Sequence, residues 1–163
     1  RDERGRDMGS LIAYVHLLAV AVLVGKVVLL SFVVAPILAK TLAREAFSTV
    51  VRQLFPAYYA LGMGAAIVGV VCVTELGMMH DVNPARHLIA AMWLIILAAE
   101  TYCRAPLTPQ SNAMRDRLKE QESCGTVDPA LQIAWNRLHQ RSVYLNSVVL
   151  FVGLCLLWLV HKL

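Results

Sequence analysis

The chain has 163 residues, of which 58% are hydrophobic and 16% are charged, and its mean hydropathy is +0.61. About a quarter of the residues in soluble domains are charged, so this composition excludes an ordinary soluble protein and indicates an integral membrane protein. The net charge of +4 is not arranged as a basic stripe interleaved with aromatic residues, so we expect the lipid bilayer, and not nucleic acid, as a partner.

The apolar residues form four blocks, each near or above the roughly 20 residues that a helix needs to cross about 30 Å of hydrocarbon. A backbone in lipid must satisfy its own hydrogen bonds, and the many short alternating segments of a β-barrel are absent. We therefore predict an all-α, four-transmembrane-helix bundle that forms a single integral membrane domain. The spans are expected at about residues 10–38, 55–79, 87–104 and 142–161.

The first connection, about residues 39–54, has apolar residues at helical spacing and its basic residues elsewhere. This pattern predicts a short interfacial helix between spans one and two, lying in the headgroup layer. Between spans two and three, the Asp, Asn and Pro of "HDVNPARH" predict a tight hairpin.

The second connection, about residues 105–141, opens with two prolines, continues as a polar helix of about three turns and stops at Gly125. The next helix is predicted to begin at Pro129, with Asp128 as its N-cap. We expect this helix to run unbroken to about residue 160. At 1.5 Å per residue this helix is roughly 50 Å long. Its first part is therefore predicted to form a long cytoplasmic extension of helix four.

Orientation is predicted from the basic residues. Nine of them lie in or beside the two long connections, whereas five lie on the opposite side, three of these largely offset by neighbouring acidic residues. The positive-inside rule then places both connections in the cytoplasm and both termini outside it, in a multi-pass protein of the cell (inner) membrane. The nine are Lys40, Arg44, Arg52, Arg104, Arg115, Arg117, Lys119, Arg137 and Arg141.

Lys26 and Glu100 are charged residues that fall inside predicted spans, away from the span ends. Lys26 lies near the middle of span one, and Glu100 lies about two thirds of the way along span three. A lone charge in lipid costs at least a few kcal/mol, so each must face a partner or water. We predict that the two face each other or share a polar cavity with the end of span four. The pair could serve only to fix the helix register, or it could be a substrate or proton site.

A second group of polar and sulfur-containing residues is expected near the opposite surface. Thioethers and imidazoles suit copper, and two histidines on facing helices can hold a b-type haem, so haem b or copper is a possible cofactor. The alternative is a helix-to-helix hydrogen bond from the histidine of span one, with Glu75 as a candidate partner. The candidate ligands are His16, Met78, Met79, His80, His87 and His161.

Small residues recur at helical spacing in span two. Gly62, Ala66 and Gly69 form a row within "LGMGAAIVG". Such rows let helices approach closely without special chemistry. We interpret this row as a packing face, directed at the bundle or at a partner chain.

Four stretches resemble successive signatures of the transmembrane protein 205 family: "YVHLLAVAVLVGKVVLLSFVVAP", "LFPAYY", "TYCRAPLTPQSNAMRDRLKEQESCG" and "RLHQRSVYLNSVVL". The resemblance implies a four-span protein with no assigned biochemical activity, from a family with a reported link to platinum-drug resistance in animals. Lys26 departs from the pattern, where an uncharged residue is expected. Looser, fold-level similarities are to copper-resistance D-type proteins and haem-containing protoporphyrinogen oxidase. The family pattern marks His16, Gly25, Phe55, Pro56, Tyr59, Pro109, Met114, His139, Ser142 and Asn146.

The last three of these positions form one stripe at the start of span four, because they are separated by three and four residues. We expect His139, Ser142 and Asn146 to face the bundle and to bind Tyr59, Glu100 or backbone freed by proline. Tyr58 is an alternative to Tyr59. Buried polar groups need partners whatever the function, so we interpret the stripe as a set of polar contacts between helices that holds the fold or a ligand.

Three functions remain open. Four spans favour an accessory or structural subunit of a larger membrane complex, with other subunits or a second copy as partners. The first alternative is a protein that binds or moves a small ligand, a metal ion or protons through Lys26, Glu100, His139 and Asn146, although conventional transporters have more helices. The second is a haem b or copper redox protein. A non-enzymatic role is expected, because there is no nucleophile elbow or phosphate loop.

Overall fold

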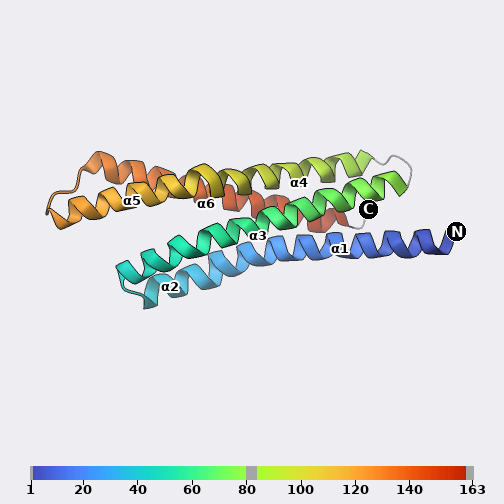
Figure 1. Ribbon diagram of the computed structural model, residues 1–163, viewed down its shortest axis with the longest axis horizontal. Helices are drawn as coiled ribbons and strands as arrows, with labels where there is room; N and C mark the ends of the chain where they lie inside the picture. The colour runs from blue at the N-terminus through green and yellow to red at the C-terminus, as the bar shows by residue number, and fades with distance from the viewer. Residues whose placement is uncertain (1, 80–83, 161–163) are drawn as a thin grey trace.

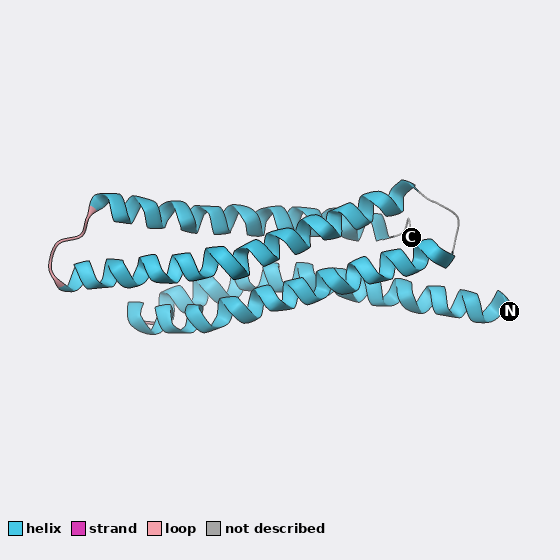
Figure 2. Ribbon diagram, turned by 45° about the horizontal axis from the view of Figure 1, so that its top comes forward, coloured by secondary structure: helices cyan, strands magenta, loops and turns pink. Residues whose placement is uncertain are grey.

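The computed structural model describes residues 2–79 and 84–160. All regular elements in these ranges are helical, and four continuous rods are long and apolar enough to cross a membrane (Figure 1). The rods run alongside one another in both views (Figure 2). The all-α four-span bundle predicted from the sequence is therefore confirmed.

The first rod consists of α1 (Asp2–Leu29), a π-helical turn η1 (Leu30–Val34) and α2 (Ala35–Thr41). The second rod is a single helix, α3 (Arg44–Met79), with Pro56 in its interior. The prediction of a separate interfacial helix between spans one and two is wrong, because residues 44–54 form the first turns of α3. The apolar positions stay in phase across Pro56, so one helix face continues and packing outweighs the one backbone bond that a proline removes.

The third rod joins α4 (Pro84–Tyr102), a π-helical segment η2 (Cys103–Leu107) and α5 (Thr108–Ser123). The chain passes both prolines of this region without a loop, so the polar helix continues span three directly. A π segment accommodates such a site by shifting the backbone bonding pattern. The Thr108 hydroxyl donates to the Cys103 carbonyl at 2.7 Å within it.

The turn into the fourth rod follows the sequence prediction. Gly125 takes a positive φ of 78°, a conformation that a glycine adopts without a steric penalty. The Asp128 carboxylate accepts a hydrogen bond from the Ala130 N–H at 2.8 Å, and α6 runs from Pro129 to Leu159. The expected cap and the unbroken fourth helix are both confirmed.

Helix α3 packs against α1 and α4, and α6 lies against α1 and α4. The core between them contains the fully buried Leu23, Trp93, Ile96 and Leu156. Because α5 and the first turns of α6 form an antiparallel pair at one end (Figure 1), we call this end, with α2 and the first turns of α3, the α5 end of the bundle.

Candidate functional site

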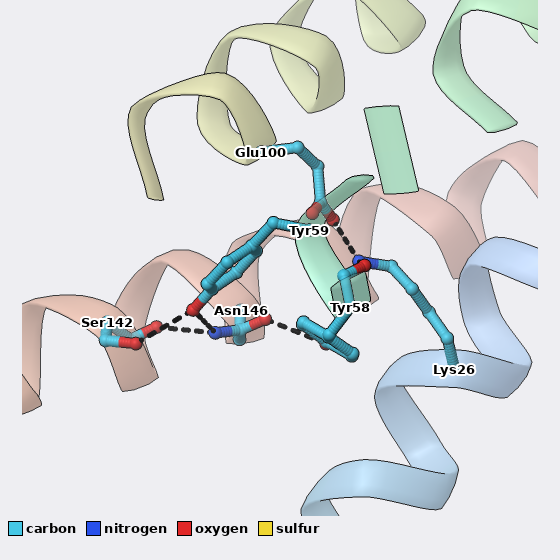
Figure 3. Close-up of polar contacts among 6 residues, drawn as sticks. All are labelled: Lys26, Tyr58, Tyr59, Glu100, Ser142 and Asn146. Atoms are coloured by element: carbon cyan, nitrogen blue, oxygen red, sulfur yellow. Dashed lines mark hydrogen bonds and ion pairs between the residues drawn. The ribbon is translucent and has the colours of Figure 1, made fainter. Parts of the chain in front are cut away.

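A buried ion pair joins the first and third rods. Lys26 Nζ lies 2.6 Å from Glu100 Oε1, and the two side chains are only 4% and 1% exposed (Figure 3). The predicted pairing of these two charges is confirmed. The ammonium group also donates to the Tyr58 carbonyl at 3.3 Å and lies 3.8 Å from the centroid of the Tyr58 ring. Together these contacts replace the water that a buried ammonium loses.

Gly62 makes room for this pair. A Cβ atom built on Gly62 would collide with the Lys26 ammonium and the Glu100 carboxylate. Ala66, one turn further along α3, is fully buried, and a Cβ on Gly69 would collide with the indole of Trp93. The small-residue row of span two therefore lies where α3 meets side chains from α1 and α4.

Beside the ion pair, four side chains from α3 and α6 form a hydrogen-bonded cluster, which we call the polar clasp: Tyr58, Tyr59, Ser142 and Asn146 (Figure 3). The Tyr58 hydroxyl donates to Asn146 Oδ1 at 2.9 Å. Asn146 Nδ2 donates to the Tyr59 hydroxyl at 3.3 Å and to the Ser142 carbonyl at 3.0 Å. The Tyr59 and Ser142 hydroxyls are 3.2 Å apart.

Tyr58 connects the two features, because its ring faces Lys26 and its hydroxyl binds Asn146. The sequence pattern favours Tyr59, with Tyr58 as the alternative, whereas both tyrosines take part in the structure. The adjacent tyrosines at the start of a span were the available signal. Both are buried, since α3 places them where α1, α4 and α6 converge.

His139 lies on the same face of α6 as Ser142 and Asn146, but the hydrogen bonds of the polar clasp do not include it. Its ring is exposed and stacks on Trp135, with the ring centroids 5.4 Å apart and the planes 4° from parallel. Trp135, one turn earlier on α6, was not singled out from the sequence. An interfacial tryptophan at helical spacing from His139 was the signal that could have identified it.

A cavity of about 560 Å³ opens beside the polar clasp, between the end of α1, α2, α3, α5 and α6. Arg115 and Trp135 line the end of the cavity that is nearer the turn between α5 and α6. Tyr59, Asn146 and Leu150 line the other end, which we call the deep end. The volume lies within the range of small-molecule sites in proteins, roughly 300–1,000 Å³. Lys26 and Glu100 are not part of its lining. The ion pair is connected to the lining through Tyr58, which contacts Lys26 and binds Asn146.

The two sides of the cavity have different linings. Apolar side chains from α1, η1, α2 and α3 make up most of one side, which also carries Ser31, Ser48 and Tyr59, whereas α5 and α6 supply most of the hydroxyl and amide groups. The apolar set includes Val27, Leu30, Leu38, Phe47, Val51, Leu54 and Phe55, and the polar set includes Thr108, Ser111, Asn112, His139, Ser142, Asn146 and Ser147. The cavity is therefore amphipathic.

Residues 18–117 match the family described as a domain of unknown function, DUF4149. The chain belongs to this family. The matched range contains the ion pair, both tyrosines of the polar clasp and Arg115, and it ends before α6. No solved structure matches the chain. Since the DUF4149 family carries no assigned activity, the function has to be argued from the site itself.

The DUF4149 match begins two residues after His16, which is fully buried on α1. His16 Nε2 accepts a hydrogen bond from the Trp93 indole N–H at 2.9 Å, and the two rings meet edge to face at 5.6 Å. The suggested Glu75 partner is wrong, because that side chain is exposed. Gly69 lets the indole reach across α3 to α1, a geometry that depends on helix packing and not on spacing in the sequence.

Of the other candidate ligands of this DUF4149 protein, the structure describes the side chains of Met78 and His87. Met78 and His87 are exposed, whereas the Met79 side chain, His80 and His161 lie outside the described residues. In the part of the chain that the structure describes, no three His, Cys, Asp or Glu side chains are grouped as a metal site would require.

Proposed function

We propose that this integral membrane protein binds one amphiphilic small molecule within the membrane and does not transform it chemically. The observation that carries this proposal is the cavity of about 560 Å³ with an apolar side, a hydroxyl- and amide-bearing side and the polar clasp at its deep end. Ligand sites combine apolar walls with a few placed polar groups in this way. The hydroxyl and amide groups would orient the polar part of the ligand.

The resemblance to the transmembrane protein 205 family supports the same site. Five of the ten positions that the family pattern marks line the cavity: Phe55, Tyr59, His139, Ser142 and Asn146. They come from two helices that are about eighty residues apart in the chain. The positive-inside rule predicts that the α5 end of the bundle faces the cytoplasm, so the proposed site would lie in the cytoplasmic half of the membrane.

Filling the cavity should weaken binding. Leu150→Trp places an indole at the deep end, where Leu150 lines the wall. Because the indole takes up space that the ligand needs, we expect binding of a single-chain probe, lysophosphatidylcholine, to weaken about tenfold or more. Native mass spectrometry of the protein released from detergent micelles measures the one-to-one adduct.

Leu154→Trp is the matched control, because Leu154 lies one turn further along α6, is exposed and does not line the cavity. It should bind the probe as the wild type does. Ser147→Trp also fills the cavity, but from an exposed position. It therefore tests the same prediction if the Leu150→Trp protein does not fold. Undiminished adducts in both cavity-filling variants would refute the proposed site.

A second candidate function, an accessory subunit or a homo-oligomer, is favoured by an aromatic stripe on α6. Tyr144, Phe151 and Trp158 are seven residues apart and 68%, 69% and 76% exposed. A repeat of seven keeps side chains on one helix-packing seam. If this face docks a partner in lipid, Phe151→Ala should weaken the assembly about tenfold or more.

Native electrophoresis after purification in mild detergent measures this second outcome. A partner present in a fixed ratio, or a dimer, should dissociate in the Phe151→Ala protein and persist in a Leu94→Ala protein, whose altered residue is exposed on α4. A wild-type protein that migrates as a monomer without partners contradicts the subunit hypothesis and leaves the ligand proposal intact.

A further inference from the structure

At the α5 end, Arg44, Arg52 and Arg115 lie near one another, and two of these three have carboxylate partners. Arg44 lies 2.8 Å from Glu122, and Arg52 contacts both oxygens of Asp116 at 2.5 and 3.2 Å. The guanidinium of Arg52 holds the pKa of Asp116 below its usual range through these hydrogen bonds. The positive charges of these two arginines are therefore balanced locally.

Arg115 is different. Within residues 2–79 and 84–160, no carboxylate lies within ion-pair distance of its guanidinium, which instead lies 5.4 Å from the centroid of the Trp135 ring. Burial and the neighbouring Arg44 and Arg52 lower its pKa, and Glu122, which lies beyond ion-pair distance, acts in the opposite direction. A half-buried, always charged guanidinium with no carboxylate in direct contact is suited to an external anion, since its planar fork matches phosphate.

The position of Arg115 relates it to the cavity. Thr108, Ser111, Asn112 and Arg115 recur at helical spacing on one face of α5, and all four line the cavity. Hydroxyl and amide groups therefore lead along the wall to the guanidinium. The side formed by α1, η1, α2 and α3 is mainly apolar, with Ser31, Ser48 and Tyr59 as its polar side chains. This arrangement, a charged end joined to an apolar slot, corresponds to the shape of a lipid molecule.

The lining of the cavity extends to the exposed apolar surface of the bundle. Phe32 on η1 and Val143 on α6 both line it, and they are 68% and 52% exposed. Apolar side chains exposed on a transmembrane bundle face acyl chains. A molecule of the surrounding bilayer can therefore reach the cavity sideways, without crossing water.

We propose that the occupant is an anionic phospholipid of the bilayer, with its phosphate paired to Arg115 and an acyl chain in the apolar part of the cavity. This inference rests on the proposed function, because it names the ligand class of the same site. Phosphate supplies the missing counterion, and Ser111 and Asn112 lie where the polar glycerol region would pass.

The test is a competition between phosphatidylglycerol and phosphatidylcholine with identical acyl chains, supplied in equal amounts to the detergent-purified full chain. Native mass spectrometry counts the retained lipid. Hydrogen bonds to charged groups correspond to about tenfold or more in affinity. We expect the wild type to retain phosphatidylglycerol preferentially, because phosphatidylcholine already carries a choline cation beside its phosphate. Arg115→Gln should lose about tenfold of the phosphatidylglycerol retention and a smaller part of the phosphatidylcholine retention.

Arg117→Gln is the matched control, since Arg117 lies on the same helix, is exposed and does not line the cavity. It should leave the preference unchanged. Arg115→Lys keeps the charge but loses the planar fork, so it should retain an intermediate amount. Equal retention of the two lipids by the wild type, or an equal loss in the Arg117 variant, would overturn the inference.

The two proposals fail differently. Leu150→Trp should weaken the retention of both lipids about equally, because it fills the cavity, whereas Arg115→Gln should weaken mainly the retention of the anionic one. If Leu150→Trp acts and Arg115→Gln does not, the cavity binds a ligand without the assigned counterion, and only the inference about the headgroup is wrong. If neither substitution acts, the proposed function is refuted as well.

Discussion

Glu100→Gln is expected to lower the free energy of unfolding by about 3–5 kcal/mol, because it leaves an uncompensated ammonium group in a membrane-spanning bundle. In the wild type, Lys26 Nζ lies 2.6 Å from Glu100 Oε1, and both side chains are almost completely buried. Removal of the carboxylate leaves the Tyr58 carbonyl and ring as the remaining partners of the ammonium. Denaturant titration of the micelle-solubilised protein measures the loss.

The matched double variant separates charge from shape. Lys26→Met/Glu100→Gln carries neither charge and keeps similar side-chain volumes, so it should recover most of the stability that the single variant loses. Glu75→Gln removes a carboxylate that is exposed on α3, and it should change the stability by less than about 0.5 kcal/mol. A Glu100→Gln protein as stable as the wild type would show that the pair does not contribute to the fold.

Gly69→Ala is expected to destabilise the protein by about 1–3 kcal/mol, although alanine is the better helix former. The added methyl would collide with the indole of Trp93, which is fully buried and donates its N–H to His16 at 2.9 Å. The indole cannot move without leaving the imidazole of His16 unpaired in the core. Thermal unfolding in detergent reports the change.

Gly64→Ala is the control for this prediction. It lies on the same helix, is exposed and has no heavy atom within 4 Å of its added Cβ. There the alanine should be neutral or should stabilise by about 0.5–1 kcal/mol, so the two glycine variants should differ in sign. Trp93→Phe, which shrinks the ring, should offset part of the Gly69→Ala loss when the two are combined. A stabilised Gly69→Ala protein would contradict the close approach of α3 and α4.

Both predictions concern the region where α1, α3, α4 and α6 converge. The ion pair joins α1 to α4, Tyr58 contacts Lys26, and its hydroxyl binds Asn146 on α6. The polar clasp next to it bounds the cavity through Tyr59, Ser142 and Asn146. The two charges therefore lie outside the cavity lining and stabilise the fold, while the hydroxyl and amide groups face the proposed ligand.

Several features of this protein could be derived from the sequence because they depend on local physical rules. The length and apolarity of the four blocks predict the spans, since lipid offers no partners for a backbone. Asp128 and Pro129 predict the start of α6 through capping and a pre-set φ angle. Lys26 and Glu100 could be paired because a lone charge in lipid is so costly that few alternatives remain.

Other features were decided only by tertiary structure. The first turns of α3 and the helix through η2 continue past prolines because packing of a helix face outweighs one lost backbone bond. His16 binds Trp93 instead of Glu75 because Gly69 lets an indole cross between helices. The cavity, the stacking of His139 on Trp135 and the unpaired guanidinium of Arg115 all depend on how α2, α5 and α6 are spaced. Spacing between helices arises from side chains far apart in the chain, and for that reason no local pattern encodes it.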